Sequence, residues 1–372
     1  MHRSFHLIIL ACGGYWLPIC AGADASKLPH SFEENRRKLK TPPPTATLAI
    51  PAIQQGLDVS KKTKANSLDK KIGSALAAAL LESAVTDQLA PPQIERARNY
   101  FLWPKKPQNS IFANPIFQEN FLYLLENAKR DRFIVGGLPA LKLTDYPSCV
   151  MVGTGRSWEA SGAVIAPRIV LTAAHITDKP ERVFFGTSLE DPLGITRKVV
   201  AKAICPGYSP SDNHKNDLML LLLDAPAPPF AAVAKLAPSD VFTKEKLRVV
   251  RIAGFGVISG ASSVGLGVKR WGDVAVVTPD SSGNDDAQYG AHPGLEFVAG
   301  DNRVDTCYGD SGGPAYWEDV NGKWWLVGIT SRWTLNRRRN CGDGGIYVRP
   351  DKYQDWIQQM ARQWNQSIDN LQ

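Results

Sequence analysis

The sequence predicts an all-β domain from residue 134 onward, closed by one helix and preceded by a helical segment. After residue 134, short runs rich in Val, Ile, Leu and Thr alternate with clusters of Gly, Pro, Asp and Ser. Many short strands separated by turn formers are typical of a β-sandwich or a β-barrel. The predicted strands are 149–152, 162–165, 169–172, 182–186, 198–203, 218–223, 248–253, 274–277, 294–298 and 324–330.

A terminal helix is predicted at about 351–365. Tyr353, Trp356, Ile357 and Met360 recur at helical spacing there, which gives the helix one apolar side. That side would pack against the β domain.

The region before the β domain has a different composition. Residues 24–66 are polar and rich in Pro, Thr and Lys, which is typical of an extended linker. Apolar residues then recur at helical spacing in three stretches, 67–90, about 93–102 and about 115–130. We therefore predict a basic, partly helical segment with a Pro-rich linker over 24–133.

The basic charge of the chain is concentrated in this upstream segment. Residues 24–133 hold 17 Lys and Arg against 11 Asp and Glu, whereas residues 134–372 hold 25 of each kind. A basic segment can bind nucleic acid or an anionic membrane. A solvated basic face explains the same composition, so no nucleic-acid partner is expected.

The first 23 residues are typical of a cleaved export signal. An apolar run at 7–19 follows Arg3, and Ala21-Gly22-Ala23 fits a signal-peptidase site. The run is too short to span a bilayer as a mature helix, so a secreted or periplasmic product without a membrane span is expected. The alternatives are a buried N-terminal segment or a lipid anchor on Cys20.

Export would place the chain in an oxidising compartment, where disulfides persist. Four cysteines lie beyond residue 23, namely Cys149, Cys205, Cys307 and Cys341. Four cysteines allow three complete pairings, and the sequence alone does not separate them.

Three distant segments carry residues suited to acyl transfer, which needs an activated nucleophile, a base and donors for an oxyanion. Ser311 lies in a Gly-Asp-Ser-Gly-Gly-Pro turn, where the backbone N–H groups of Gly309 and Ser311 can converge on one point. His175 follows an apolar run, and Asp217 immediately precedes another. A carboxylate placed there can orient an imidazole and stabilise its cation. We therefore predict a triad of His175, Asp217 and Ser311.

Each triad residue taken alone has an ordinary structural explanation, so the prediction depends on their joint occurrence. His214 and His292 lie in polar segments and are predicted to be surface residues. His214 is three residues from Asp217, which makes it the alternative base. The sequence has no glycine-rich phosphate loop or metal-ligand cluster, so no cofactor and no metal are expected.

Together these segments resemble the trypsin-like, chymotrypsin-fold serine endopeptidases, in which the three residues occur in the order His, Asp, Ser. The resemblance covers about residues 134–360. It implies two six-stranded antiparallel β-barrels with a C-terminal helix. It also implies a zymogen with a helical prosegment, which an activating peptidase converts to the active form.

The segment at 134–137 (Ile-Val-Gly-Gly) resembles the new N-terminus that activation creates in this family. The resemblance implies that the freed α-amino group of Ile134 pairs with Asp310 and orders the oxyanion hole and the specificity pocket. Cleavage after Arg130 or Arg132 would leave Phe133 attached. We therefore expect an activator that cuts after Phe133, or trimming by a second peptidase.

Asp305 matches the family position at the base of the primary specificity pocket, and Ser331 and Gly345 are predicted to belong to the same pocket. A buried carboxylate there implies cleavage after Arg or Lys, because a neutral substrate side chain would leave it unpaired. A solvated loop Asp is the alternative. Arg332 and Trp333 follow Ser331 where the family usually has an aromatic residue and a glycine. Either residue could narrow the pocket or neutralise Asp305.

Cys307 and Cys341 match the family disulfide that joins the two sides of this pocket, so the resemblance implies that bond. Two other family bridges are missing, since Ile176 and Val298 stand where a Cys is common. Cys149 and Cys205 are expected to pair with each other or to remain free.

The expected function is that of a secreted serine endopeptidase acting on protein or peptide substrates. A non-catalytic binding protein on the same fold is the first alternative. The second is a protein that acts through its basic segment, 24–133, at an anionic surface.

Overall fold

The computed structural model describes residues 111, 114–127, 138–176, 180–258, 263–283, 286–300, 305–335, 337 and 341–368. The predicted export signal, the linker and the helical stretches at 67–90 and 93–102 lie outside these residues, as do Phe133 and Ile134. No helix within the described ranges is long and apolar enough to cross a membrane.

The third predicted upstream helix is α6, Pro115–Asn127. Asn114 caps its N-terminus, because the side-chain Oδ1 accepts hydrogen bonds from the backbone N–H groups of Ile116 at 2.8 Å and Phe117 at 3.3 Å. Pro115 occupies the first helical position, where its missing N–H costs nothing.

Six antiparallel strands form the first barrel. They are β2 (Cys149–Gly153), β3 (Trp158–Ala166), β4 (Ile169–Thr172), β5 (Arg182–Phe185), β6 (Ile195–Ile204) and β7 (Met219–Leu223). The barrel closes in the order β2-β3-β4-β7-β6-β5. Half-buried and exposed residues alternate along β6, as expected for a strand with one face toward solvent.

The second barrel also has six antiparallel strands, with a short additional strand, β1 (Leu138–Pro139), paired to one of them. The six are β8 (Val249–Gly254), β9 (Arg270–Thr278), β10 (Glu296–Gly300), β11 (Pro314–Glu318), β12 (Trp324–Trp333) and β13 (Gly345–Val348). Their order is β9-β10-β13-β12-β11-β8, and pairing of β8 with β9 closes the barrel. Short 3-10 helices occur before, within and after this barrel: η4 (Ser239–Val241) precedes β8, η5 (Asp286–Tyr289) connects β9 to β10, and η6 (Pro350–Tyr353) follows β13 and leads into α7 (Gln354–Gln363).

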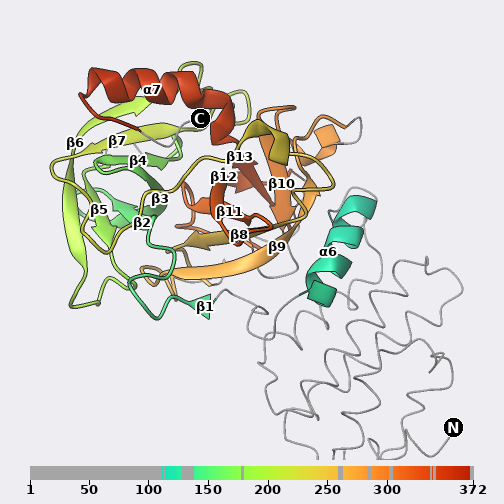
Figure 1. The fold of residues 1–372 in the computed structure, drawn as a ribbon, viewed down its shortest axis with the longest axis horizontal. Helices are drawn as coiled ribbons and strands as arrows, with labels where there is room; N and C mark the ends of the chain where they lie inside the picture. Colours follow the sequence, from blue (N-terminus) through green and yellow to red (C-terminus); the bar gives the residue numbers. More distant parts are fainter. Residues whose placement is uncertain are drawn as a thin grey trace, which may run out of the picture. The chain divides into compact units, whose positions relative to one another are not determined.

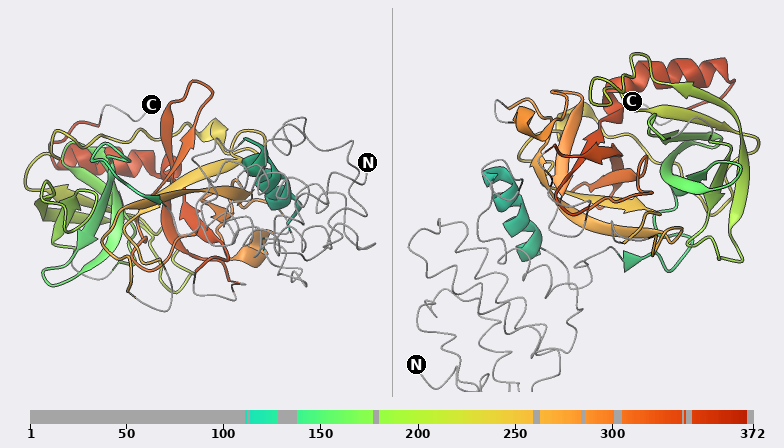
Figure 2. Two further views of the ribbon diagram at one scale, coloured as in Figure 1. Left: turned by 90° about the horizontal axis from the view of Figure 1, so that it is seen from below. Right: turned by 180° about the vertical axis from the view of Figure 1, so that it is seen from behind.

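The two barrels lie side by side, and α7 runs along the first of them (Figures 1 and 2). One hydrophobic cluster is continuous across both barrels, since it contains Phe184 and Leu220 from the first and Phe255 and Ile329 from the second. Ile357 of α7 belongs to the same cluster. Each such fully buried side chain stabilises the fold by about 1.5–3 kcal/mol.

The prediction of two antiparallel barrels with a terminal helix is confirmed, and the sandwich alternative is wrong. Cys307 and Cys341 form a disulfide. Cys149 and Cys205 are free and buried, so they do not pair with each other. Burial raises the pKa of both thiols to about 12, which leaves them in the neutral form.

Candidate active site

His175 and Asp217 come together because the strands that precede and follow them are neighbours. β4 and β7 pair with Thr172 opposite Met219, so the chain leaving β4 starts beside the chain entering β7. The Asp217 carboxylate then accepts two hydrogen bonds from His175, from the backbone N–H at 2.8 Å and from the ring Nδ1 at 2.7 Å. His175 is therefore held by Asp217 both at its backbone and at its ring.

Ser311 comes from the second barrel, in the turn before β11. His175 Nε2 lies 2.8 Å from Ser311 Oγ. The serine turn is tied to β3 of the first barrel, since the backbone N–H of Ser161 donates to the carbonyl of Ser311 at 2.8 Å and its hydroxyl donates to the carbonyl of Gly309 at 2.9 Å. The structure therefore brings the three predicted triad residues into one hydrogen-bonded row at the junction of the barrels.

Two glycines give the serine turn its shape. Gly309 and Gly312 have φ angles of +93° and +80°, in the left-handed region that only glycine adopts without strain. A Cβ on Gly309 would lie 2.8 Å from Leu266 Cδ1 and 3.0 Å from Gly256 Cα. The backbone can take this path only without a side chain at Gly309, as expected for a turn whose N–H groups converge.

Asp217 is charged although it is buried with no exposed surface. Burial opposes its ionisation, but hydrogen bonds from His175 and from Ser331 outweigh that effect and hold its pKa below the usual value. Ser331 Oγ donates to Asp217 Oδ2 at 2.5 Å. Ser331, expected in the specificity pocket, thus also completes the set of donors around Asp217.

The prediction that His214 is a surface residue is wrong. Its ring is half-buried and packs edge-on to that of His175, with centroids 5.5 Å apart. Its Nδ1 lies 3.1 Å from the Tyr208 hydroxyl. Burial lowers the pKa of His214 and keeps the ring neutral. No hydrogen bond among the described residues joins it to Ser311, whereas His175 has one.

His175, His214 and Asp217 each place one potential ligand atom within 4.8 Å of the others. The sequence did not indicate this cluster, because the loop fold that brings His214 back to His175 is a tertiary feature. Both Asp217 oxygens already accept hydrogen bonds from His175 or Ser331.

A cavity of about 610 Å³ opens over this row of residues. His175, His214 and Ser311 line it, together with Thr306, Tyr308, Arg332, Trp333, Leu335 and Arg337. Trp333 packs edge-on against Tyr308 at 5.0 Å, and the Arg337 guanidinium lies 4.0 Å from the Trp333 ring centre. The large side chain of Trp333 therefore occupies part of the wall where the resembled family has a glycine.

Asp305 does not line this cavity within the described residues, although its neighbour Thr306 does. Its carboxylate accepts hydrogen bonds from the backbone N–H groups of Thr306 at 2.8 Å, Gly342 at 3.2 Å, Asp343 at 3.1 Å and Gly344 at 2.8 Å. Removal from solvent nevertheless raises the pKa of Asp305 to about 7.

Asp310 and Asp305 line a second, smaller cavity of about 60 Å³ beside β8 and β9. The Asp310 carboxylate accepts from the N–H of Gly256 at 2.8 Å and of Cys307 at 2.9 Å. Removal from solvent raises its pKa to about 6, although Arg270 acts in the opposite direction. This carboxylate has room beside it for a further cationic group.

Gly345 begins β13 next to the pocket residue Thr306. A Cβ on Gly345 would lie 3.0 Å from Thr306 Oγ1, so a side chain at this position would require the neighbouring side chains to move. Arg332, one of the two residues expected to affect Asp305, is paired elsewhere: its guanidinium lies against Glu296, with Nη2 to Oε2 at 2.8 Å. Sequence reasoning missed Glu296 because nothing local links it to Arg332.

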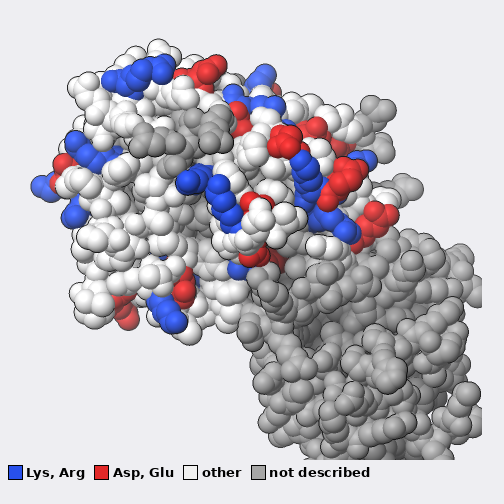
Figure 3. Space-filling view, viewed as in Figure 1, with Lys and Arg blue, Asp and Glu red and all other residues white. Residues whose placement is uncertain are grey.

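Charges on the visible face of the barrels are mixed in sign, with Lys and Arg interspersed among Asp and Glu (Figure 3). This matches the balanced composition of residues 134–372. The charged side chains described on this face therefore do not form a broad field of one sign.

Two antiparallel barrels that meet at such a site define a serine-type endopeptidase, a hydrolase of peptide bonds. The Trypsin family model matches residues 134–357, which is more than half of the chain, and the chain belongs to the trypsin family.

The chain is similar in sequence to several known proteins. A venom plasminogen activator of Gloydius brevicauda, Haly-PA, is 30% identical over 245 residues, covering 62% of this chain and 87% of the relative. Human kallikrein-14 is 26% identical over 266 residues, covering 70% and 96%. Mouse transmembrane protease serine 11G is 26% identical over 241 residues, covering 57% and 56%.

Proposed function

We propose that the chain cleaves peptide bonds with Ser311 as nucleophile, His175 as base and Asp217 as the group that orients His175. The observation that carries this proposal is the unbroken row of contacts from Asp217 Oδ2 to His175 Nδ1 at 2.7 Å and from His175 Nε2 to Ser311 Oγ at 2.8 Å. With Asp217 ionised, Nδ1 keeps its proton and Nε2 is free to accept the hydroxyl proton.

In the first step, Ser311 Oγ attacks the substrate carbonyl carbon while its proton passes to His175 Nε2. The imidazolium then donates that proton to the leaving amine, and an acyl-enzyme ester remains on Ser311. A water molecule, deprotonated by His175, hydrolyses the ester and restores the serine. In both steps the backbone N–H groups of Gly309 and Ser311 stabilise the oxyanion, consistent with the positive φ of Gly309.

The proposed activation step uses the small cavity beside Asp310. After cleavage, the α-amino group of Ile134 would enter this cavity and pair with the Asp310 carboxylate. The raised pKa of Asp310, about 6, supports the proposal, because a buried carboxyl gains most from a nearby cation. The carboxylate also accepts from the N–H of Cys307, two residues before Gly309, so the pairing would act on the oxyanion turn. Phe133 must be removed for Ile134 to reach it.

We further propose that residues 1–23 direct export and that 24–133 form a propeptide. Two propeptide residues contact the second barrel: Ile111 is 2% exposed, and Asn114 Nδ2 donates to the Tyr289 hydroxyl at 3.0 Å. A Cβ on Gly344 would lie 3.1 Å from Ile111 Cγ2. Since Gly344 donates to Asp305, this contact links the propeptide to the loop that holds Asp305.

Cleavage after Arg or Lys, selected by Asp305, completes the proposal. The position of Asp305 next to the cavity residue Thr306 supports it. A substrate cation would have to displace some of the backbone N–H groups that Asp305 now binds. Opening of the loop at 342–344 on activation would provide that access.

A peptide-library digest tests the proposal, with wild type and Ser311→Ala compared after removal of residues 1–133. The expected result is cleavage after Arg or Lys by wild type alone, with a serine-directed fluorophosphonate labelling only wild type. Labelling without an Arg or Lys preference would contradict the role of Asp305. The absence of both labelling and cleavage would indicate a non-catalytic binding protein.

A further inference from the structure

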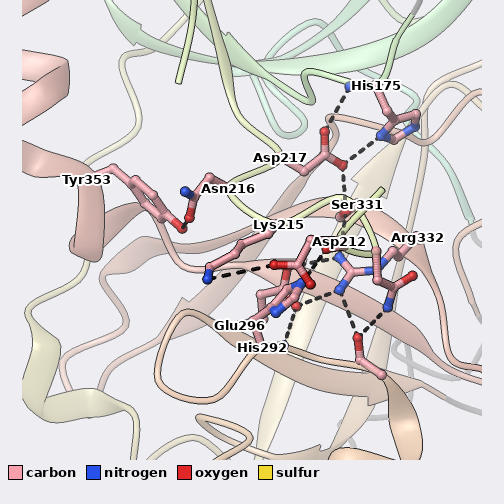
Figure 4. A network of polar contacts seen from close by, with 12 residues as sticks. His175, Asp212, Lys215, Asn216, Asp217, His292, Glu296, Ser331, Arg332 and Tyr353 are labelled. Carbon is pink, nitrogen blue, oxygen red and sulfur yellow. Dashed lines mark hydrogen bonds and ion pairs between the residues drawn. The ribbon is translucent and has the colours of Figure 1, made fainter. Parts of the chain in front are cut away.

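A buried ion pair lies behind the active site, between Arg332 of β12 and Glu296 of β10. The contact is bidentate, with Nη1 to Oε1 and Nη2 to Oε2 both at 2.8 Å. The two side chains are only 9% and 1% exposed. Figure 4 shows this pair within a network of polar contacts that leads through Ser331 and Asp217 to His175.

Ser331 joins the ion pair to the active site. Arg332 Nη1 donates to Ser331 Oγ at 3.1 Å, and Ser331 Oγ donates to Asp217 Oδ2 at 2.5 Å. A guanidinium has only donors, and a hydroxyl has a single proton. With Arg332 occupying an acceptor site of Ser331, the hydroxyl proton of Ser331 is directed to Asp217.

Hydrogen bonds also connect the same ion pair, through the segment before β10, to the loop that leads into Asp217. Arg332 Nη2 donates to the carbonyl of Gly290 at 2.9 Å, and Asn213 Nδ2 donates to that carbonyl at 2.6 Å. The backbone N–H of His292 donates to Glu296 Oε2 at 2.7 Å, while the ring Nε2 of His292 donates to the carbonyl of Asp212 at 3.0 Å. The segment before β10, which contains Gly290 and His292, is therefore hydrogen-bonded both to the Arg332–Glu296 pair and to the loop that leads into Asp217.

This loop needs such support. Asn213, His214 and Asn216 have φ angles of +45°, +57° and +56°, and a left-handed backbone persists only where surrounding contacts hold it. On the other side, the Tyr353 hydroxyl donates to Asn216 Oδ1 at 2.8 Å. Asp217 thus follows a strained segment that is held at several points.

We propose that Arg332 is a positioning residue for peptide-bond hydrolysis, acting through Ser331 on the Asp217 carboxylate, with Glu296 holding Arg332 in place. The inference rests on the proposed triad. In this proposal the Arg332–Glu296 pair has a role other than neutralising Asp305. The Nη1 and Nη2 atoms of Arg332 already bond to Glu296, Ser331 and Gly290. Loss of Arg332 would free the Ser331 hydroxyl to turn away, so that Asp217 would orient His175 less tightly.

The test compares four variants with wild type in enzyme activated by removal of residues 1–133, with kcat and KM measured on one peptide substrate and Tm measured in parallel. Arg332→Met removes the donor but leaves Glu296 buried and unpaired. The double variant Arg332→Met/Glu296→Met removes the unpaired charge as well. Arg332→Lys retains a cation, and Arg251→Met is the matched control, since Arg251 makes a buried bidentate pair with Asp273 at 2.6 and 2.7 Å.

Arg332→Met should lower kcat by about tenfold or more, as expected when a catalytic group is misplaced, and should leave KM close to that of wild type. The double variant should regain Tm relative to Arg332→Met without regaining kcat. Arg332→Lys should restore part of kcat, and Arg251→Met should lower Tm but leave kcat unchanged.

Wild-type kcat in the double variant would overturn the inference, because the pair would then be merely structural. A change in KM alone would also overturn it, since Arg332 would then contact substrate. Wild-type enzyme no faster than Ser311→Ala would overturn the proposed triad together with this inference, so the two failures are distinguishable.

Discussion

The Ser161 hydroxyl, in the first barrel, donates to the carbonyl of Gly309, in the serine turn of the second barrel, at 2.9 Å. The Ser161 Oγ also accepts a hydrogen bond from the backbone N–H of Phe255 at 3.0 Å. Ser161 is buried with no exposed surface, so one side chain joins the two barrels at the turn that carries Ser311.

Ser161→Ala should therefore affect both stability and activity. It leaves the N–H of Phe255 and the carbonyl of Gly309 without this partner in a buried site, which costs about 1–3 kcal/mol for each such group in the free energy of unfolding. It should also lower kcat, because Gly309 supplies a proposed oxyanion donor. Denaturant unfolding and steady-state kinetics would measure the two effects.

The control is Ser148→Ala, which removes another buried serine hydroxyl, 2.6 Å from the Tyr316 hydroxyl. A loss of stability without a change in kcat is expected there. An equal loss of kcat in both variants would contradict the specific role of Ser161.

Gly312→Ala should be far more damaging than Gly294→Ala. Both glycines have positive φ, +80° and +73°, so both substitutions incur about 1–2 kcal/mol of backbone strain. At Gly312 the new Cβ would also overlap Thr172 Oγ1 and the Ser161 carbonyl, whereas at Gly294 nothing lies within 4 Å. Tm and kcat should fall together for Gly312→Ala, and only a small fall in Tm is expected for Gly294→Ala. Equal Tm losses would show that the overlap is relieved by movement.

Asp305 should make stability fall as the pH rises from about 4 to about 7. Burial raises its folded-state pKa from 3.8 to about 7, so in this range the folded chain binds a proton that the unfolded chain has lost. Stability is highest below the unfolded pKa and is lost as the pH rises through the folded pKa, by a few kcal/mol in total. Asp305→Asn cannot ionise, so its unfolding free energy should vary less with pH. Parallel curves for the two proteins would contradict the assignment.

The Cys307–Cys341 disulfide should stabilise the second barrel. It joins residues 34 positions apart, and its removal in Cys307→Ala/Cys341→Ala should cost about 3–4 kcal/mol through the freedom gained by the unfolded chain. Activity should fall as well, since Cys307 lies two residues before Gly309.

Cys149→Ala/Cys205→Ala is the matched control for that bridge, because these cysteines are buried but free. It should lose only part of the packing energy of two small side chains, and its Tm should fall in reducing buffer as much as that of wild type, because the Cys307–Cys341 bond is retained. A Tm that no longer differs between oxidising and reducing buffer in this variant would contradict the assignment, because the redox response of wild type would then come from Cys149 and Cys205.

The strands predicted best from sequence were those with continuous β-branched or leucine-rich runs. β4 has the predicted bounds, Ile169–Thr172, because all four of its residues are buried and the first three are apolar. β11, Pro314–Glu318, was not predicted as a strand, since it begins with Pro and ends with Glu. β9 is longer than predicted because Arg270 and Asp273 extend it. The paired Arg251 allows Asp273 to be buried, and that partner lies on another strand.

The sequence predicts the parts of the site that lie in a local motif. It does not predict the parts that depend on how the loops run in space. The turn around Ser311 needs glycines that are visible in the sequence. The proximity of His214 to His175, and the pairing of Arg332 with Glu296, depend on how separate connections fold back toward each other. No local periodicity encodes those meetings.

His175 and Asp217 come from one barrel and Ser311 from the other, so neither half contains the whole of the proposed triad. Two polypeptides divided in the connection between β7 and β8 would each be inert. The rate of hydrolysis by a mixture of the two would then depend on the concentration of the reassembled complex. That rate would measure how strongly the two halves associate.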